Sequence, residues 1–313
     1  MNVEKLLPEA INFMRDGEIE KAQSFLNQIL KEFPKNPDAL TQSGIILIHE
    51  RKFKKGINLI ESSLLIKPNQ PEALLHLGIA FYQENKFDQA IKYFDDAIKL
   101  QPDYSEAIYT KALSYEKMNL IEDAINNYNL ALNKNPNYLN PIINLAYLYF
   151  KLENFEIAKN FFIKAQNLNP ENNEFSQKIS EINNHLGNYD ESLEYWDKRI
   201  LSDPTDADAY NNKAVTLMNL DRLDEAKVLF LRGLELNEND TTLMINLAGL
   251  YEEQREYTQA EIFCKKILDL VPHHDKSINM LGKIAIDLGK NDSAHSYINQ
   301  ALNLRPDNLY ALL

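Results

Sequence analysis

The chain has 313 residues, and its 33 Lys and Arg against 46 Asp and Glu give a formal charge of −13, which disfavours nucleic acid or an anionic membrane surface as a partner. Its 44% hydrophobic and 25% charged residues are typical of a soluble globular protein, and only nine glycines argue against long flexible loops. The single cysteine, Cys264, excludes an internal disulfide and favours a reducing cytoplasm.

The N-terminal segment, residues 1–22, places charged residues between apolar ones at helical spacing and has no apolar core of the kind that a signal peptide needs. No stretch of the sequence approaches the roughly 18 apolar residues that a membrane span requires. We therefore expect a cytoplasmic protein without membrane insertion.

Prolines recur along the chain at a fixed spacing. Eight of the twelve are separated by 34 residues or by twice that number: Pro34, Pro68, Pro102, Pro136, Pro170, Pro204, Pro272 and Pro306. A fixed period of this length indicates a tandem repeat. Aligned on the prolines, nine repeats begin at Val3, Pro37, Pro71, Ser105, Leu139, Asn173, Ala207, Thr241 and Asp275.

The eighth and twentieth residues of every repeat are small. The eighth residues are Ala10, Gly44, Gly78, Ala112, Ala146, Ser180, Ala214, Ala248 and Gly282. The twentieth residues are Ala22, Gly56, Ala90, Ala124, Ala158, Ser192, Ala226, Ala260 and Ala294. Because a larger side chain would force two crossing helices apart, these positions predict a close helix crossing in each repeat.

Each repeat reads as a helix, a short turn and a second helix, and residues 71–104 show this most clearly. Residues 71–84 carry apolar side chains at helical spacing, and Asn85 follows where a left-handed cap residue is needed. Asp88 is suited to cap or start the second helix, which Pro102 ends.

This pattern resembles the tetratricopeptide repeat, which residues 71–104 match at Leu74, Gly78, Phe81, Ala90, Phe94, Ala97 and Pro102. The resemblance covers residues 3–306. It implies an all-α fold, a right-handed superhelical solenoid of about nine antiparallel helical hairpins, whose first helices line a concave face and whose second helices lie outside.

In this family the concave face is lined by the second, fifth, sixth, ninth, twelfth and thirteenth residues of each repeat. In the first five repeats several of these positions are apolar or aromatic, and we expect them to contact a partner: Ile11, Ile45, Ile48, Ile79, Tyr82, Leu113, Tyr147 and Phe150. The alternative is that these side chains pack against neighbouring first helices. From the sixth repeat onward the same positions turn polar, as at Glu181, Glu252 and Lys283.

The sixth positions include Asn144, Asn212 and Asn246, whose amides can both donate and accept along an extended peptide backbone. This series resembles the asparagine ladder of the protein O-linked N-acetylglucosamine transferases, although Lys178 and Met280 interrupt it. No repeat carries the Lys and Asn pair of the carboxylate clamp that binds chaperone C-termini in this family, so binding of that type is not expected.

Two segments depart from the pattern. Repeat six, residues 173–206, replaces small or apolar residues by Ser176, Ser180, Asn183 and Ser192, and it is either a joint or a repeat with tolerated sequence drift. Residues 307–313 read as the start of a truncated or uncapped tenth helix, which would leave Ile298, Ala301 and Leu302 exposed and open this end to a partner or to self-association.

A search for chemistry finds no phosphate-binding loop, no cysteine pair and no nucleophile motif. His273, His274 and Asp275 are weak candidates for a metal site, because neighbouring histidines point in different directions. We expect no catalytic residue, no metal and no cofactor, and therefore no enzyme activity in this chain.

The sequence favours a scaffold that binds a protein or peptide, held as an extended or helical segment in the concave groove. One alternative is the substrate-recognition arm of a larger bacterial glycosyltransferase or sulfotransferase, whose leading repeats the opening of this chain resembles. Another is a structural subunit that stacks through its uncapped end.

Overall fold

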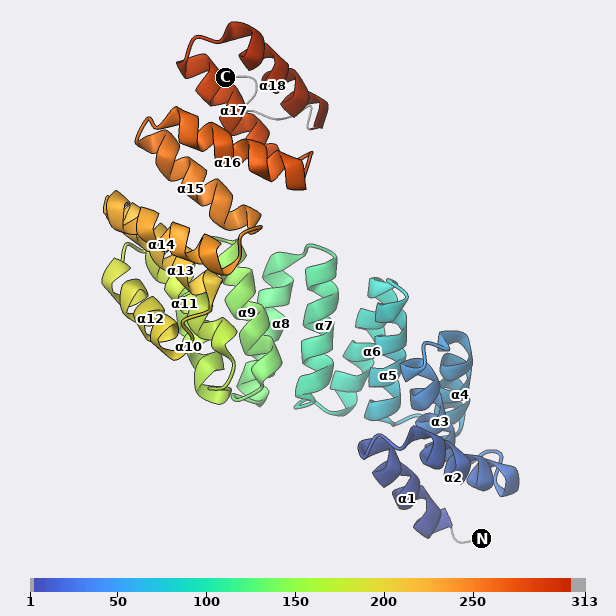
Figure 1. The fold of residues 1–313 in the computed structure, drawn as a ribbon. Helices are drawn as coiled ribbons and strands as arrows, with labels where there is room; N and C mark the ends of the chain where they lie inside the picture. The colour runs from blue at the N-terminus through green and yellow to red at the C-terminus, as the bar shows by residue number, and fades with distance from the viewer. Residues whose placement is uncertain (1–2, 305–313) are drawn as a thin grey trace. The chain divides into compact units, whose positions relative to one another are not determined.

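The computed structural model describes residues 3–304, which form eighteen α-helices in tandem and no strand (Figure 1). The first helices of the hairpins are α1 (Val3–Arg15), α3 (Pro37–His49), α5 (Pro71–Gln83), α7 (Ser105–Lys117), α9 (Leu139–Lys151), α11 (Asn173–His185), α13 (Ala207–Asn219), α15 (Thr241–Glu253) and α17 (Asp275–Asp287). The second helices are α2 (Ile19–Glu32), α4 (Phe53–Ile66), α6 (Phe87–Leu100), α8 (Ile121–Lys134), α10 (Phe155–Leu168), α12 (Tyr189–Ser202), α14 (Leu223–Leu236), α16 (Tyr257–Leu270) and α18 (Asn291–Leu304). The all-α fold of helical hairpins predicted from the period is confirmed.

The turn inside each hairpin needs one residue with positive φ. The fifteenth residue of every repeat adopts it, at φ between 59° and 78°: Gly17, Arg51, Asn85, Asn119, Glu153, Gly187, Asp221, Arg255 and Gly289. The cap predicted at Asn85 is therefore found in all nine turns. Asp88 lies in the first turn of α6, whereas the N-cap residue is Lys86, which makes no side-chain capping bond.

The helices cross closely at the small residues, as predicted. The alanines at the eighth and twentieth positions are fully buried, apart from Ala294 at 6% exposed. At Gly78 an added Cβ would collide with the Phe94 ring, with Cδ1 at 2.6 Å. The ring at position 24 thus fills the space that the missing side chain leaves, and Phe94, Tyr128, Phe162 and Phe230 are all completely buried there.

The first helices begin at side-chain caps in several repeats. Asn36 accepts a hydrogen bond from the Ala39 amide at 2.9 Å, and Asp240 accepts from Thr242 and Leu243. These bonds satisfy amides that the first turn of a helix leaves without a partner. In these repeats the caps fix where the first helix starts.

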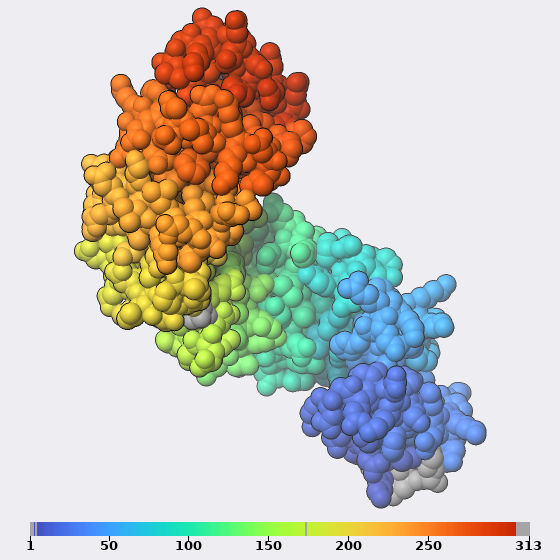
Figure 2. Space-filling model, in the orientation of Figure 1, coloured from blue at the N-terminus to red at the C-terminus, as the bar shows by residue number. Residues whose placement is uncertain are grey.

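Helices of the chain form two compact units. Within the described residues, unit 1 runs to Glu153 and adds Asn160–Asn169, whereas unit 2 comprises Asn154–Lys159 and the residues from Pro170 onward. Inside each unit a hairpin packs its second helix, and in places its first, against the first helix of the next repeat. Within each unit, Figure 2 shows the surfaces of successive repeats in contact. Unit 2 begins its hairpin series at repeat six; the joint proposed inside residues 173–206 stays a prediction.

Repeat six accommodates its polar residues by pairing them. Ser180 and Ser192 lie 2.8 Å apart at the helix crossing, and Ser192 also contacts the Thr216 hydroxyl at 3.2 Å. Arg199 donates to Asp206 at 2.7 Å. The substitutions therefore replace apolar packing by hydrogen bonds within unit 2.

The C-terminal hairpin differs in part from the expectation. Ala301 is only 2% exposed, so the prediction that it would be open to solvent is wrong. Ile298 and Leu302 are half-buried, whereas residues at position 24 in earlier repeats are fully buried. Residues 307–313, predicted to begin a tenth helix, lie outside the described residues.

Candidate functional site

Positions 2, 5, 6, 9, 12 and 13 of each repeat lie on the first helices, and we call the accessible part of this set within each unit the first-helix face. In unit 1 its ninth and twelfth positions are mostly apolar or aromatic. Six of the side chains predicted to contact a partner are half-exposed on it: Ile11, Ile79, Tyr82, Leu113, Tyr147 and Phe150. Partial exposure of large apolar side chains in successive helices gives a surface that a ligand could bury further.

Ile45 and Ile48, which were expected on the same open surface, are instead in the core. They are 3% and 1% exposed and pack in one cluster with Ile60, Ala73 and Leu77. Their apolar character is explained by this packing between α3, α4 and α5. We therefore leave both out of the candidate site.

Aromatic contacts brace the half-exposed rings. The Tyr82 ring lies 5.6 Å from Phe87, centroid to centroid, and the Tyr147 ring meets the buried Phe162 edge-to-face at 5.0 Å. Such contacts limit side-chain motion before a ligand arrives. A partner would therefore meet a surface with little conformational freedom to lose.

A hydrogen-bond chain crosses three helices beneath this surface. Asn144 of α9 donates through Nδ2 to the Tyr128 hydroxyl at 2.9 Å, and that hydroxyl donates to Glu116 Oε2 at 2.5 Å. Burial first, and Glu116 second, raise the pKa of Tyr128, so the phenol remains a donor. The chain fixes the Glu116 carboxylate near the end of α7.

Tyrosines and glutamates gather around this point. Burial, and then the neighbouring Tyr138, Tyr82 and Glu116, raise the pKa of Tyr109 to about 12. Burial and Glu116 likewise raise the pKa of Tyr82. The Tyr109 ring lies 5.9 Å, centroid to centroid, from the ring of Tyr128, whose hydroxyl donates to Glu116. Tyr109 and Glu116 therefore share one local environment, and Tyr82 lies close enough for Glu116 to affect its pKa.

A second acidic group lies at the start of the same helices. Burial, and then Glu72, raise the pKa of Glu106, and burial with Glu106 and Glu72 raises the pKa of Tyr104 to about 12. Glu72 itself accepts a hydrogen bond from the Gln42 amide at 3.2 Å. The first-helix face of unit 1 thus combines rings with carboxylates.

His76, at a sixth position, is held neutral. Burial, and then His49, lower its pKa to about 4, and the rings of the two histidines are 6.0 Å apart. Its Nδ1 atom is buried without a hydrogen-bond partner among the described residues. Burying this atom without a partner destabilises the folded chain, and burying the ring in its protonated, charged form would destabilise it further.

The other two asparagines predicted to contact a peptide, Asn212 and Asn246, lie in unit 2, and each donates an amide hydrogen to another residue of the chain. Asn212 donates to the Asp208 carbonyl at 2.9 Å, and Asn246 donates to Asn211 Oδ1 at 2.8 Å. Charged groups on this face also pair with each other, as Lys283 does with Glu252 at 2.7 Å. These polar groups of the first-helix face in unit 2 therefore already have partners within the chain.

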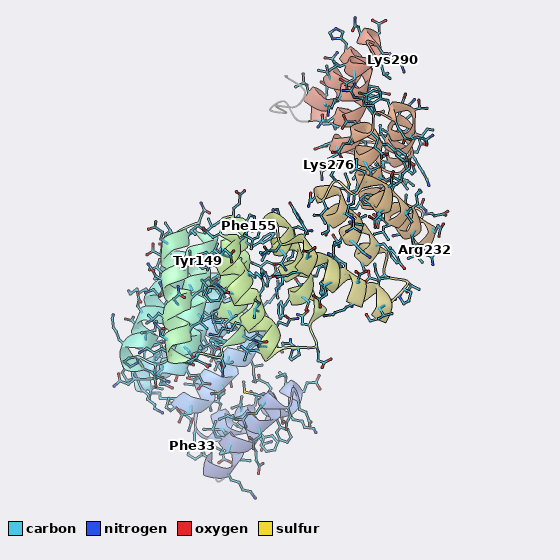
Figure 3. The ribbon with its side chains drawn as sticks, turned by 90° about the vertical axis from the view of Figure 1, so that its left-hand side faces the viewer. Phe33, Tyr149, Phe155, Arg232, Lys276 and Lys290 are labelled. Atoms are coloured by element: carbon cyan, nitrogen blue, oxygen red, sulfur yellow. The ribbon has the colours of Figure 1, made fainter. Side chains whose placement is uncertain are left out.

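Unit 2 also carries a hollow of about 650 Å³ on its last hairpin. Apolar side chains from α15, α17 and α18 line much of it: Ile245, Ile278, Met280, Ile286, Tyr297 and Ile298. Lys276, at the start of α17, also lines the hollow and is labelled in Figure 3, as is Lys290 just beyond the other end of that helix.

The residues weighed for chemistry have structural roles. His274 caps α17 by accepting from the Ser277 amide at 3.3 Å, and burial raises the pKa of Cys264 to about 12. Within residues 3–304 no three His, Cys, Asp or Glu side chains gather in a way that could hold a metal ion. The same residues include no helix that is both long and apolar enough to span a membrane.

Sequence reasoning missed Glu116, Tyr109 and Tyr128 as members of one group. Their signal was present, because Glu116 occupies a twelfth position that is apolar or aromatic in the repeats on either side. The hydrogen bond between Glu116 and Tyr128 could not be predicted without knowing how α7 and α8 cross. The pairing comes from the structure.

The tetratricopeptide repeat family matches this chain in several places: residues 9–36, 71–104, 141–172, 207–240 and 275–308. Together these matches cover more than half of the sequence. The resemblance seen in residues 71–104 is thereby confirmed. A resemblance to glycosyltransferases in particular finds no such support.

Curated relatives match a smaller part. Sperm-associated antigen 1 of Rattus norvegicus is 27% identical over 110 residues, which cover 35% of this chain and 12% of that protein. The Mus musculus protein of the same name is 28% identical over 104 residues, or 33% and 11%. The chain thus spans about an eighth of the length of these relatives.

Solved structures share the fold at low identity. YrrB, described as a tetratricopeptide repeat protein with an unusual peptide-binding site, aligns at a TM-score of 0.52 and 18% identity, over 59% of this chain and 95% of its own. A repeat protein from Parabacteroides merdae aligns at 0.51 and 18%, over 80% and 98%. With the family matches and the eighteen helices in tandem, these likenesses lead to one conclusion: the chain belongs to the tetratricopeptide repeat family.

Proposed function

We propose that this chain is a protein-interaction scaffold that binds an extended or helical polypeptide segment on the first-helix face of unit 1. The observation that carries the proposal is the series of half-exposed rings and aliphatic side chains on α5, α7 and α9, namely Ile79, Tyr82, Leu113, Tyr147 and Phe150. Ile79 and Tyr82 also pack against the core of their own repeat, but part of each side chain stays exposed, and a bound segment would remove that part from water.

The membership of the family supports the same function, since stacked repeats offer a long surface and no enclosed catalytic pocket. YrrB shares the fold and has a peptide-binding site by its description, which makes peptide binding a reasonable hypothesis for this chain. Asn144, Asn212 and Asn246 remain candidates for contacting a peptide backbone. Their contribution is the smaller one, because each already uses one amide hydrogen inside the chain.

The test uses the full chain with Tyr82→Asp and Leu113→Asp combined. Proteins captured from a lysate of the source organism are identified, made recombinantly and titrated against both forms. Burying a large apolar side chain contributes about 1.5–3 kcal/mol, so the double variant should weaken binding at least a hundredfold, at low and high salt alike.

The matched control is Leu130→Asp on α8, where the leucine is 40% exposed but lies on a second helix. It should leave binding within about twofold. Circular dichroism and melting curves must show that all variants are folded. If the double variant is folded and binds every partner as tightly as the wild type, the first-helix face of unit 1 is not the binding surface.

The hollow on the last hairpin favours a second candidate, a subunit that associates through this end. Ile286 is 55% exposed there, beside the half-buried Ile298. Sedimentation of the wild type and of Ile286→Asp over a range of concentrations measures the oligomeric state of each and tests this association. Loss of an oligomer in the variant supports association, and a monomer throughout contradicts it.

A further inference from the structure

Glu116 is placed against the local preference of its helix. It is the next-to-last residue of α7, where the partial negative charge of the helix dipole disfavours a carboxylate. Other acidic residues of this face, Glu72 and Glu106, lie in first turns, where the dipole favours them. The helix dipole therefore accounts for Glu72 and Glu106 but leaves Glu116 unexplained.

The structure nevertheless holds Glu116 in place. Tyr128, which donates to it at 2.5 Å, is completely buried and is itself bonded by Asn144. Three helices, α7, α8 and α9, thus orient one carboxylate. Orientation of this kind prepares a charged group for contact with another group.

Among the described residues, no cation neutralises this carboxylate. Within residues 3–304 Glu116 forms no ion pair with Lys, Arg or His, and the adjacent Lys117 is an exposed side chain. Burial and acidic or phenolic neighbours raise the pKa of Tyr82 and Tyr109. Arg51 and Lys117 line a hollow with Tyr82 but do not pair with Glu116. The surroundings are partly desolvated, so a cation placed at this point would interact more strongly than on an open surface.

We propose that the surface formed by Tyr82, Tyr109 and Glu116 binds an arginine side chain of the polypeptide that occupies unit 1. The planar guanidinium stacks on a tyrosine ring and donates to a carboxylate in one geometry. A lysine ammonium matches the charge but not the plane. This inference rests on the proposed function, since it names the chemistry that the same face selects.

The probe is a library of random dodecapeptides displayed on phage and selected against the immobilised full chain. Selected sequences should be enriched in arginine at one aligned position. The tightest peptide is then synthesised with arginine, with lysine, and with citrulline, which keeps the shape of arginine but removes its charge. All three are titrated against wild type, Glu116→Gln and the control Glu122→Gln.

Glu116→Gln keeps an oxygen that can accept from Tyr128, so it removes charge with little effect on packing. Glu122 is an exposed residue in the first turn of α8 and should tolerate the same change. In wild type and the control, citrulline should weaken binding about tenfold or more, as a charge-assisted bond implies. In Glu116→Gln the arginine and citrulline peptides should bind within about twofold of each other.

The outcomes separate the two proposals. Selected peptides that bind this face, and lose affinity with Tyr82→Asp and Leu113→Asp, but show no arginine preference or no dependence on Glu116, overturn the arginine site and leave the scaffold function standing. A preference for lysine over arginine overturns it as well. Failure to select any peptide, or peptides indifferent to Tyr82 and Leu113, overturns both.

Discussion

Two glycines in the middle of first helices have opposite surroundings, although both read as weak points in a helix. At Gly78 an added Cβ meets the Phe94 ring, with Cδ1 at 2.6 Å, whereas at Gly249 the nearest atom is Met280 Cε at 3.9 Å. We expect Gly78→Ala to lower the free energy of unfolding by about 1–3 kcal/mol through overpacking. Gly249→Ala should raise it by about 0.5–1 kcal/mol, because alanine favours helix.

Urea unfolding of both variants measures the two changes in the free energy of unfolding, provided that the m-value is the same as in the wild type. The sign is the decisive result. If Gly78→Ala stabilises the chain as Gly249→Ala does, the helix crossing at position 8 is not as close as the structure shows.

A single residue, His76, is expected to make the free energy of unfolding depend on pH. Its folded pKa, lowered to about 4 by burial and by His49, lies below the value of 6.5 for an unperturbed histidine. Between these values the unfolded chain binds the proton and the folded chain does not, so stability falls as pH drops from about 6.5 toward 4. At about pH 5 the loss should reach roughly 2 kcal/mol.

The measurement compares urea midpoints at about pH 7 and pH 5 for wild type, His76→Gln and the exposed control His273→Gln. His76→Gln should reduce the pH-dependent loss, and His273→Gln should not. An unchanged loss in His76→Gln would assign the pH effect to other groups.

At the scale of one element, the hairpin turn constrains a single backbone position. Position 15 has positive φ in all nine repeats, yet Arg51 and Arg255 occupy it in two of them, at φ 60°. A residue with a Cβ adopts this conformation at a cost of about 1 kcal/mol, which glycine avoids. Arg255→Gly should therefore raise the free energy of unfolding by up to about 1 kcal/mol, and Gly187→Ala should lower it by a similar amount.

Thermal unfolding of the two variants tests the turn, and Arg222→Gly, on the neighbouring position 16 of another repeat, serves as the control. Arg222 has φ −93°, so glycine gains nothing there and should destabilise. A destabilised Arg255→Gly would mean that contacts of the arginine side chain outweigh backbone strain.

Elements were predictable from sequence because the period repeats their signals nine times. Small residues marked the crossings, and Gly or Asn at position 15 marked the turn in five of the nine repeats. The candidate site was less predictable. Ile45 and Ile79 share position 9 and look equivalent in the sequence, but Ile45 is buried and Ile79 half-buried. Burial at one position depends on side chains from neighbouring repeats, and a period within one repeat carries no information about them.

The whole molecule is an array in which each repeat depends on its neighbours, so local stability follows local packing. Repeat six has less apolar packing than the others at its crossing, where Ser180 and Ser192 replace the usual alanine or glycine. Asn183 Oδ1 and Trp196 Nε1 are buried there without hydrogen-bond partners among the described residues. Each buried polar atom without a partner costs about 1–3 kcal/mol.

We therefore predict faster amide exchange across α11 and α12 than across α13 and α14 of the same unit, or α7 and α8 of unit 1, measured by mass spectrometry on the full chain. Ser180→Ala combined with Ser192→Ala restores the crossing found in repeats four and five and should slow exchange in α11 and α12, because paired hydroxyls are replaced by apolar contacts. Ser192→Ala alone should not, since it removes the 2.8 Å contact between the two hydroxyls and leaves the buried Ser180 hydroxyl only the long bond to the Ser192 carbonyl at 3.5 Å. Equal protection of repeat six and its neighbours in the wild type would show that the hydrogen bonds of Ser180, Ser192 and Arg199 compensate fully for the lost packing, and the proposed joint would be abandoned.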